Sequence, residues 1–189
     1  MCRSSPQTAT WWSTTSAVTS EECWRAGALK IRQASSRDLA TVQSILSEAS
    51  AWLASKGIEQ WPDGGFPEEQ TARRIWQGSV FLALVDGEPV ATITLDAWAD
   101  PEFWDAPDDA GYVHRLAVRR RWAGRGIGEA LLDWAGRRIA KSGGHWLRLD
   151  CMRENRSLHD YYRRLGFEHV RDIELGHRIS GSLFQRPAR

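Results

Sequence analysis

The stretch "VHRLAVRRRWAGRGIGEALLDWA", residues 113–135, contains three local patterns in succession. An apolar run ends at Val118, and three arginines follow it. Glycines then stand at Gly124, Gly126 and Gly128, and the residues after them have the spacing of an amphipathic helix. The stretch therefore predicts a strand, a glycine-rich turn and a helix from Gly126 to about Ser142.

A turn of this kind is suited to an anion. The first amides of a helix have no partner inside the helix, and the helix start has partial positive charge. Glycines let further backbone N–H groups come close to a bound anion. Four arginines add positive charge nearby, at Arg119, Arg120, Arg121 and Arg125. We therefore expect a phosphate group at this turn.

The two commonest phosphate-binding motifs do not fit. The dinucleotide pattern requires a third glycine where this chain has Glu129. The nucleotide triphosphate loop requires a lysine directly after Gly128, which is absent. Taken alone, the turn could also be a structural connector beside a solvated basic run.

The rest of the chain predicts one domain over residues 29–189 that follows a flexible extension, residues 1–28. We expect a mixed α/β architecture, with a central mixed sheet of about six to seven strands flanked by about four helices. The expected strands are 28–35, 79–85, 88–98, 112–120, 145–151, 167–175 and 178–186. The expected helices are 37–57, 67–78, 126–142 and 154–166.

Composition excludes several classes of protein. The net charge of +1 argues against a nucleic-acid partner. No apolar run is long enough to span a membrane, so no membrane partner is expected. The three cysteines (Cys2, Cys23 and Cys151) have no zinc-type spacing, and they favour a reducing, cytoplasmic setting without disulfides or a bound metal.

A second motif identifies a family. The stretch "LRLDCMRENRSLHDYYRRLGFE", residues 147–168, follows the first at a fixed distance. It places Asn155, Tyr162 and the pair Gly166-Phe167 downstream of the glycine turn. Together the two stretches resemble the GNAT superfamily of acyl-CoA-dependent N-acetyltransferases, over residues 29–189. The resemblance implies the GNAT fold, acetyl-CoA as co-substrate and transfer of an acetyl group to an amine.

The resemblance also implies which residues bind coenzyme A. The pyrophosphate would be held by the amides of the turn, and the pantetheine arm would pair with a bulged strand. The family's turn opens with Gln or Arg where this chain has Ala123, unless the turn begins two residues earlier at Arg121. The expected cofactor-binding residues are Leu116, Ala117, Val118, Ala123, Gly124, Arg125, Gly126, Ile127, Gly128, Asn155 and Tyr162.

Four candidates carry the chemistry of the reaction. Tyr162 matches the family's acid, which protonates the leaving thiolate, although it also falls on an apolar helical stripe. Asn155 is expected to cap its helix. The family's usual carboxylate is replaced by Tyr112, so His114 on the same face and Asp96 on the neighbouring strand are the candidate bases.

The acceptor site is expected in two loops rich in aromatic and acidic side chains, a composition that suits a small cationic amine or an amine-bearing antibiotic. A protein or peptide acceptor, or a non-catalytic acyl-CoA-binding module, is the alternative. A homodimer is an open possibility for the family. Cys151 has no base partner in the sequence and is interpreted as a packing residue. The candidate substrate-binding residues are Trp61, Glu59, Asp96, Trp98 and Tyr112.

Overall fold

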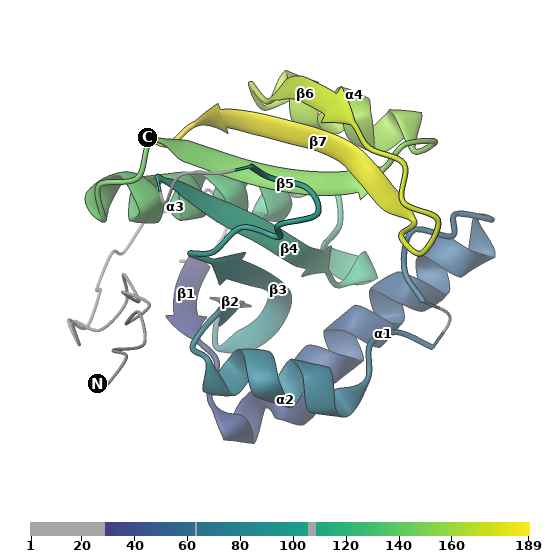
Figure 1. The fold of residues 1–189 in the computed structure, drawn as a ribbon. Coiled ribbons are helices and arrows are strands. Elements are labelled where there is room, and N and C mark those ends of the chain that lie inside the picture. Colours follow the sequence, from purple (N-terminus) through teal and green to yellow (C-terminus); the bar gives the residue numbers. More distant parts are fainter. Residues whose placement is uncertain (1–28, 63, 106–108) are drawn as a thin grey trace, which may run out of the picture.

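One seven-stranded sheet organises the chain, with the strand order β1-β2-β3-β4-β5-β7-β6 (Figure 1). The computed structural model describes residues 29–62, 64–105 and 109–189, so the predicted extension lies outside the described residues. The strands are β1 Leu29–Gln33, β2 Val80–Val85, β3 Glu88–Asp96, β4 Ala110–Val118, β5 Trp146–Met152, β6 Glu168–Asp172 and β7 Ser180–Pro187. The helices are α1 Leu39–Ser55, α2 Glu68–Trp76, α3 Ile127–Lys141 and α4 Arg156–Arg164, with short 3-10 turns η1 Ser36–Asp38 and η2 Arg120–Trp122.

This order confirms the predicted mixed α/β architecture. Strand boundaries differ by a few residues: β4 begins at Ala110 rather than Tyr112, and β6 ends at Asp172 rather than at residue 175. Gly111 explains part of the first difference. It pairs with Leu147, and a Cβ at this position would lie 2.0 Å from Ile139 of α3, so only glycine fits this strand so close to a helix. Glycine within a strand often marks such a close approach of a neighbouring element.

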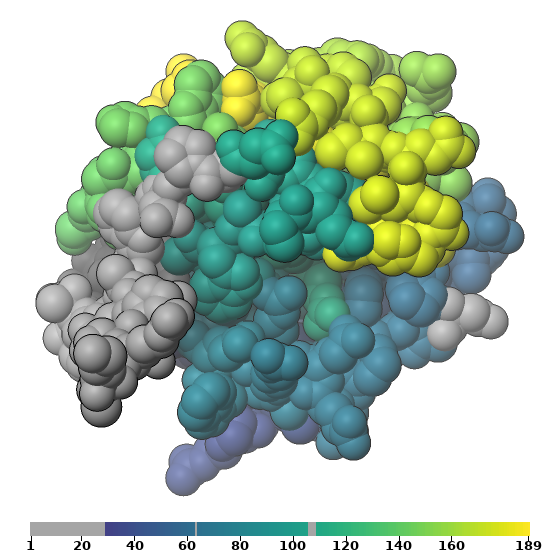
Figure 2. All heavy atoms as spheres, in the orientation of Figure 1, coloured from purple at the N-terminus to yellow at the C-terminus, as the bar shows by residue number. Residues whose placement is uncertain are grey.

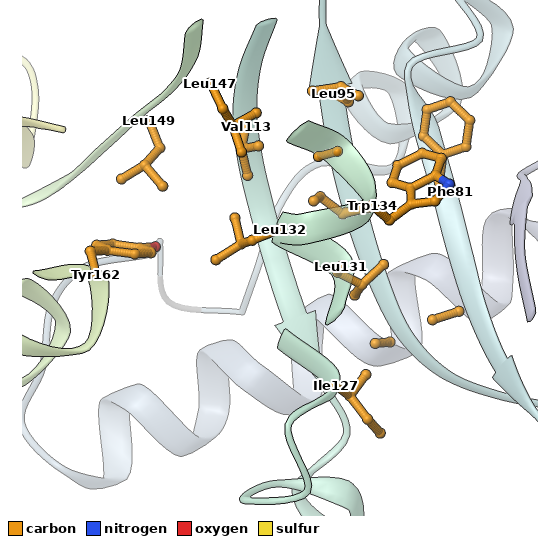
Figure 3. Close-up of a cluster of buried hydrophobic side chains, with 14 of the residues drawn as sticks. Phe81, Leu95, Val113, Ile127, Leu131, Leu132, Trp134, Leu147, Leu149 and Tyr162 are labelled. Carbon is orange, nitrogen blue, oxygen red and sulfur yellow. The ribbon is translucent and has the colours of Figure 1, made fainter. Parts of the chain in front are cut away.

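The two helical layers follow from the alternation of side chains along the strands. On β2, Phe81 and Val85 belong to the cluster packed under α3, whereas Val80 and Leu82 pack against α1 and α2. Ile75 of α2 joins the second cluster. A strand that is buried on both faces has a continuous apolar sequence, and β2, with the sequence "VFLALV", is such a strand. Figure 3 shows the larger cluster, with side chains of α3 lying against the sheet.

The sheet is forked at its centre. All neighbouring strands are antiparallel except β4 and β5, which are parallel. Their pairing ends at Val113 and Leu149, and in the described residues the rest of β4 has no partner on the β5 side. Figure 1 shows the two strands diverging beyond this point.

A bulge lies on β4 just beyond the fork. Thr94 pairs with His114 but Thr92 pairs with Ala117, so β4 has one residue more than β3 over this interval. Arg115 takes up the extra length with a φ of 49°, in the left-handed region. The bulge expected in this strand is therefore present.

Candidate functional site

A cavity of about 590 Å³ lies at the open side of the fork. Its walls come from α1, the segment between α1 and α2, the bulged end of β4, the start of α3 and one face of α4. The residues that line it are Ala49, Trp52, Leu53, Lys56, Ile58, Gln60, Trp61, Leu116, Ala117, Val118, Arg120, Gly128, Asn155, Ser157, Leu158, Tyr161 and Tyr162.

The end of β4 presents free backbone to this cavity. The amide of Arg119 donates to Val90 O of β3 at 2.9 Å, which fixes the direction of its neighbours. Because successive residues of a strand direct their backbone groups to opposite sides, Val118 and Leu116 face the gap beside β5. Ala117 pairs toward β3 instead, so only alternate residues of this strand can hydrogen-bond a ligand lying in the fork.

The glycine turn forms an anion-binding nest. Gly124 and Gly126 have φ values of 75° and 77°, and Gly126 is the N-cap of α3. Within the described residues, the amides of residues 124–126 have no hydrogen-bond acceptor. The first amides of α3 are free as well, as at any helix start. Free N–H groups at a glycine turn and a helix start suit an anion such as a pyrophosphate without a specific side chain.

The arginines before the turn have different partners. Arg119 pairs with Glu48 of α1 at 2.8 Å, and Arg121 pairs with Glu88 of β3. Arg120 stacks its guanidinium 3.8 Å from the ring centre of Trp52 and lines the cavity. Arg120 is thus the arginine of the run that is placed to meet an anionic ligand.

Tyr162 lies in the wall of the cavity and is almost completely buried, with 7% of its surface exposed. Figure 3 shows its ring extending from α4, with the hydroxyl oxygen directed away from that helix. Burial, together with the nearby Cys151 and Tyr161, raises the pKa of this phenol well above its usual value. The group is therefore protonated at physiological pH and can act as a proton donor.

Asn155 stands at the start of α4 as the expected cap. Its Oδ1 accepts from the amide of Leu158 at 3.1 Å, and its Nδ2 donates to Gln60 Oε1 at 2.8 Å. The side chain thereby joins α4 to the segment between α1 and α2. Gln60 was not predicted, because its role depends on a contact 95 positions along the chain.

The candidate bases lie together on the neighbouring strands. His114 Nε2 is 3.7 Å from Asp96 Oδ2, and His114 Nδ1 is 3.6 Å from Asp150 Oδ1. Asp96 is buried and forms an ion pair with Arg74 of α2, while its Oδ1 has no partner in the described part of the chain. Sequence reasoning missed Asp150 and Arg74, because they reach the site through strand pairing and helix packing that no sequence pattern gives.

The remaining predicted substrate residues are divided between the cavity and other parts of the structure. Trp61 lines it and contacts Phe66 edge-on, with ring centres 5.3 Å apart. Glu59 and Trp98 are exposed, the latter at 39%. Tyr112 is buried in a separate cluster, where Arg148 donates to its hydroxyl at 3.2 Å.

The loop of Trp98 is tied to the far end of the sheet. Arg178, between β6 and β7, pairs with Asp100 and Glu102. Arg171 of β6 donates to Phe103 O at 2.8 Å. Figure 2 shows the β6–β7 segment in yellow beside the teal residues before β4, above the blue helices.

Cys151 is buried and unpaired. Burial and the charges of Asp150 and Asp172 raise the pKa of its thiol to about 12. A thiol of this kind is not a nucleophile at neutral pH, which agrees with its interpretation as a packing residue.

The site combines a gap between two diverging strands, free amides at a helix start and a buried tyrosine in the cavity wall. These are the features of a site that transfers an acyl group from acyl-CoA. The chain belongs to the acetyltransferase (GNAT) family, whose pattern matches residues 45–167. Over 139 residues, or 69% of this chain and 77% of the relative, it is 34% identical to an uncharacterized N-acetyltransferase, YesJ, of Bacillus subtilis (strain 168). These matches confirm the expected family and an acyl-CoA-dependent N-acetyltransferase.

Three further comparisons concern one relative and two solved structures. An aminoglycoside N(6')-acetyltransferase type 1 of Stenotrophomonas maltophilia is 29% identical over 134 residues, covering 69% of this chain and 87% of the relative. A GNAT acetyltransferase structure from Listeria monocytogenes 4b F2365 superposes with a TM-score of 0.76 at 22% identity, covering 89% of this chain and 99% of the other. The structure of yncA from Salmonella typhimurium with acetyl-CoA has a TM-score of 0.64 at 16% identity, covering 85% and 94%.

Within the described ranges, no helix combines the length and the apolar character needed to cross a membrane.

Proposed function

We propose that this protein transfers the acetyl group of acetyl-CoA to the primary amine of a small cationic metabolite or an amine-bearing antibiotic. The observation that carries the proposal is the continuity of the site. Gly128 at the start of α3, Leu116 and Val118 at the open edge of β4, and Tyr162 of α4 all line one cavity. The Salmonella structure contains acetyl-CoA as its cofactor, and this supports the choice of donor.

The chain's own groups supply each task of the reaction. The turn amides bind the pyrophosphate, and Leu116 and Val118 pair with the pantetheine arm as an added strand. The Leu116 amide stabilises negative charge on the thioester oxygen, an interaction of roughly 3–4 kcal/mol in comparable sites. The amine nitrogen bonds to the carbonyl carbon, the C–S bond breaks, and Tyr162 gives its proton to the leaving sulfur.

Removal of the ammonium proton requires a base. An alkylammonium has a pKa of roughly 10, so little free amine exists at neutral pH. His114 is exposed over 26% of its side chain, next to the fork, whereas the carboxylate of Asp96 is already engaged by Arg74. We therefore assign the base role to His114.

The charged groups around His114 indicate what kind of amine the site accepts. Two carboxylates, Asp96 and Asp150, flank the proposed base, and Asp100 and Glu102, which are paired with Arg178, lie on the loop before β4. Acidic and aromatic surroundings favour a cationic amine. The aminoglycoside acetyltransferase of Stenotrophomonas maltophilia is a relative that acts on such a compound by name.

The test is a turnover assay. The protein is mixed with acetyl-CoA and a panel of polyamines, amino sugars, aminoglycosides, amino-acid derivatives and peptides, and thiol release is followed. Turnover with a small polycationic amine supports the proposal. Turnover on peptides alone points to a protein acetyltransferase, and coenzyme A binding by calorimetry without any turnover points to a non-catalytic module.

A further inference from the structure

His114 lies between two carboxylates that come from the strands on either side of it. Asp96 is on β3 and Asp150 is on β5. The two nitrogens of the ring each face one of them, at 3.7 Å and 3.6 Å. Because the β4–β5 pairing ends one residue earlier, the contact between His114 and Asp150 lies at the mouth of the fork.

The two carboxylates are not equivalent. Asp96 Oδ2 is bonded by Arg74, so its charge is largely compensated by that guanidinium. The hydroxyl of Ser180 and the charge of Arg178 both lower the pKa of Asp150, but Arg178 is itself paired with acids of the loop before β4. Asp150 is therefore the carboxylate with charge left to act on the imidazole.

The carboxyl of Asp150 is ionised at neutral pH. Its side chain is only 14% exposed, and burial raises the pKa of the carboxyl. The contacts with His114 and Ser180 and the charge of Arg178 outweigh burial and leave the pKa below its ordinary value. A buried, ionised carboxylate next to an imidazole nitrogen favours a proton on that nitrogen.

We propose that Asp150 is the positioning residue for the base: it keeps the proton of neutral His114 on Nδ1, so that Nε2 has the lone pair that accepts the ammonium proton. The proposal rests on the proposed acetyl transfer, and it gives a role to a residue of the second motif to which the sequence assigned none. The 3.6 Å separation is longer than a hydrogen bond. Contacts of this type are often long in a free enzyme and shorten when substrate binds.

Asp150 also stabilises the product of the proton transfer. When the acceptor nitrogen gives its proton to Nε2, the ring becomes a cation between two carboxylates. The other charged groups that face it are Arg74 beside Asp96, Arg115 next to it on β4, and Arg178 beside Asp150. With three arginines nearby, loss of the Asp150 charge leaves the imidazolium in a less favourable field.

The experiment compares Asp150→Asn with Asp86→Asn. Asp86 is exposed in the β2–β3 turn with a φ of 51°, which asparagine tolerates well, so this control removes the same charge without touching the site. For Asp150→Asn we expect kcat/KM to fall roughly 10–100-fold, the range typical of positioning partners. The acidic limb of the pH–rate profile should move to lower pH, and the KM for acetyl-CoA and the melting temperature should stay within error of the control.

A second readout does not depend on turnover. The ¹⁵N shifts of the His114 ring, assigned by comparison with His114→Gln, report which nitrogen has the proton. Nδ1–H in the wild type and a mixture of tautomers in Asp150→Asn support the proposal, even if no amine in the panel is acetylated and the proposed function fails. A wild-type Nε2–H tautomer, or an unchanged pH profile in an active Asp150→Asn enzyme, would overturn it.

Discussion

The side-chain nitrogen Nδ2 of Asn155 donates to Gln60 Oε1 at 2.8 Å, and this hydrogen bond joins two segments of the cavity wall that are far apart in sequence. The same side chain caps α4 through Leu158. One residue thus couples the helix that bears Tyr162 to the segment that bears Trp61. The local stability of α4 and the shape of this part of the cavity wall therefore depend on the same side chain.

Two substitutions separate these roles of Asn155. Asn155→Asp keeps an acceptor for the Leu158 amide but loses the donor to Gln60, so we expect little change in unfolding free energy and a higher KM for the amine. Asn155→Ala loses both contacts and should cost about 1 kcal/mol of stability in addition. Chemical denaturation and steady-state kinetics measure the two effects. Equal stability losses in both variants would contradict the assignment of the cap.

The Tyr162→Phe variant should bind coenzyme A normally but turn over more slowly. The phenyl ring still packs against Phe167 and Phe184, while the proton donor is gone. We expect kcat to fall roughly 10²–10⁴-fold, the usual contribution of a positioned acid, with coenzyme A affinity maintained in calorimetry. Tyr161→Phe removes a hydroxyl from the neighbouring residue and should cost far less. A Tyr162→Phe enzyme at full rate would remove Tyr162 from the mechanism.

Gly128 is required by the neighbouring helix rather than by its backbone angle. A Cβ at this position would lie 2.8 Å from the Tyr161 hydroxyl, closer than real Cβ atoms approach. Gly128→Ala should therefore displace Tyr161 into the cavity and weaken coenzyme A binding. The next atom of that ring is 3.9 Å away, so Tyr161→Phe in the same chain should restore the affinity. Additive losses in this double-mutant cycle would show that the two residues are not in contact.

Cys151 should resist alkylation in the native state. Its pKa of about 12 and its 1% exposure leave almost no accessible thiolate at pH 8. Because the folded pKa is above the unfolded value, the contribution of the neutral thiol to stability is complete below pH 9 and is lost as the pH rises toward 12. Peptide mapping after iodoacetamide treatment should show Cys151 modified only in denaturant, and rapid native labelling would refute its burial.

Much of the local structure of the glycine turn and of α4 could be predicted from the sequence. Gly124, Gly126 and Asn155 act through the local backbone, so their spacing along the chain is enough to indicate a nest and a cap. Helix periodicity likewise placed Tyr162 on a buried face. These features depend on residues within a few positions of one another, which is the range over which a sequence pattern determines structure.

The acceptor half depends on contacts between strands and loops. Alternation correctly put Tyr112 and His114 on one face of β4, but it could not show that the segment before β4 brings Trp104 over Tyr112, with ring centres 6.1 Å apart. Asp150 becomes a neighbour of His114 only once the β4–β5 register is known. Arg74 reaches Asp96 from a helix of another layer. Such pairings are set by tertiary packing, so sequence reasoning could not identify them.

The early end of β4–β5 pairing divides the sheet into two panels joined by only a short shared edge. A pantetheine arm lying in the fork would act as a brace between these panels. Deuterium uptake at the amides of Leu116 and Val118 should then slow in the presence of coenzyme A, whereas Ala117, already paired to β3, should change little. In this view the pantetheine arm of the coenzyme fills the gap between the two parts of the sheet. Its release after each turnover removes that connection, so the two parts are then free to shift against each other.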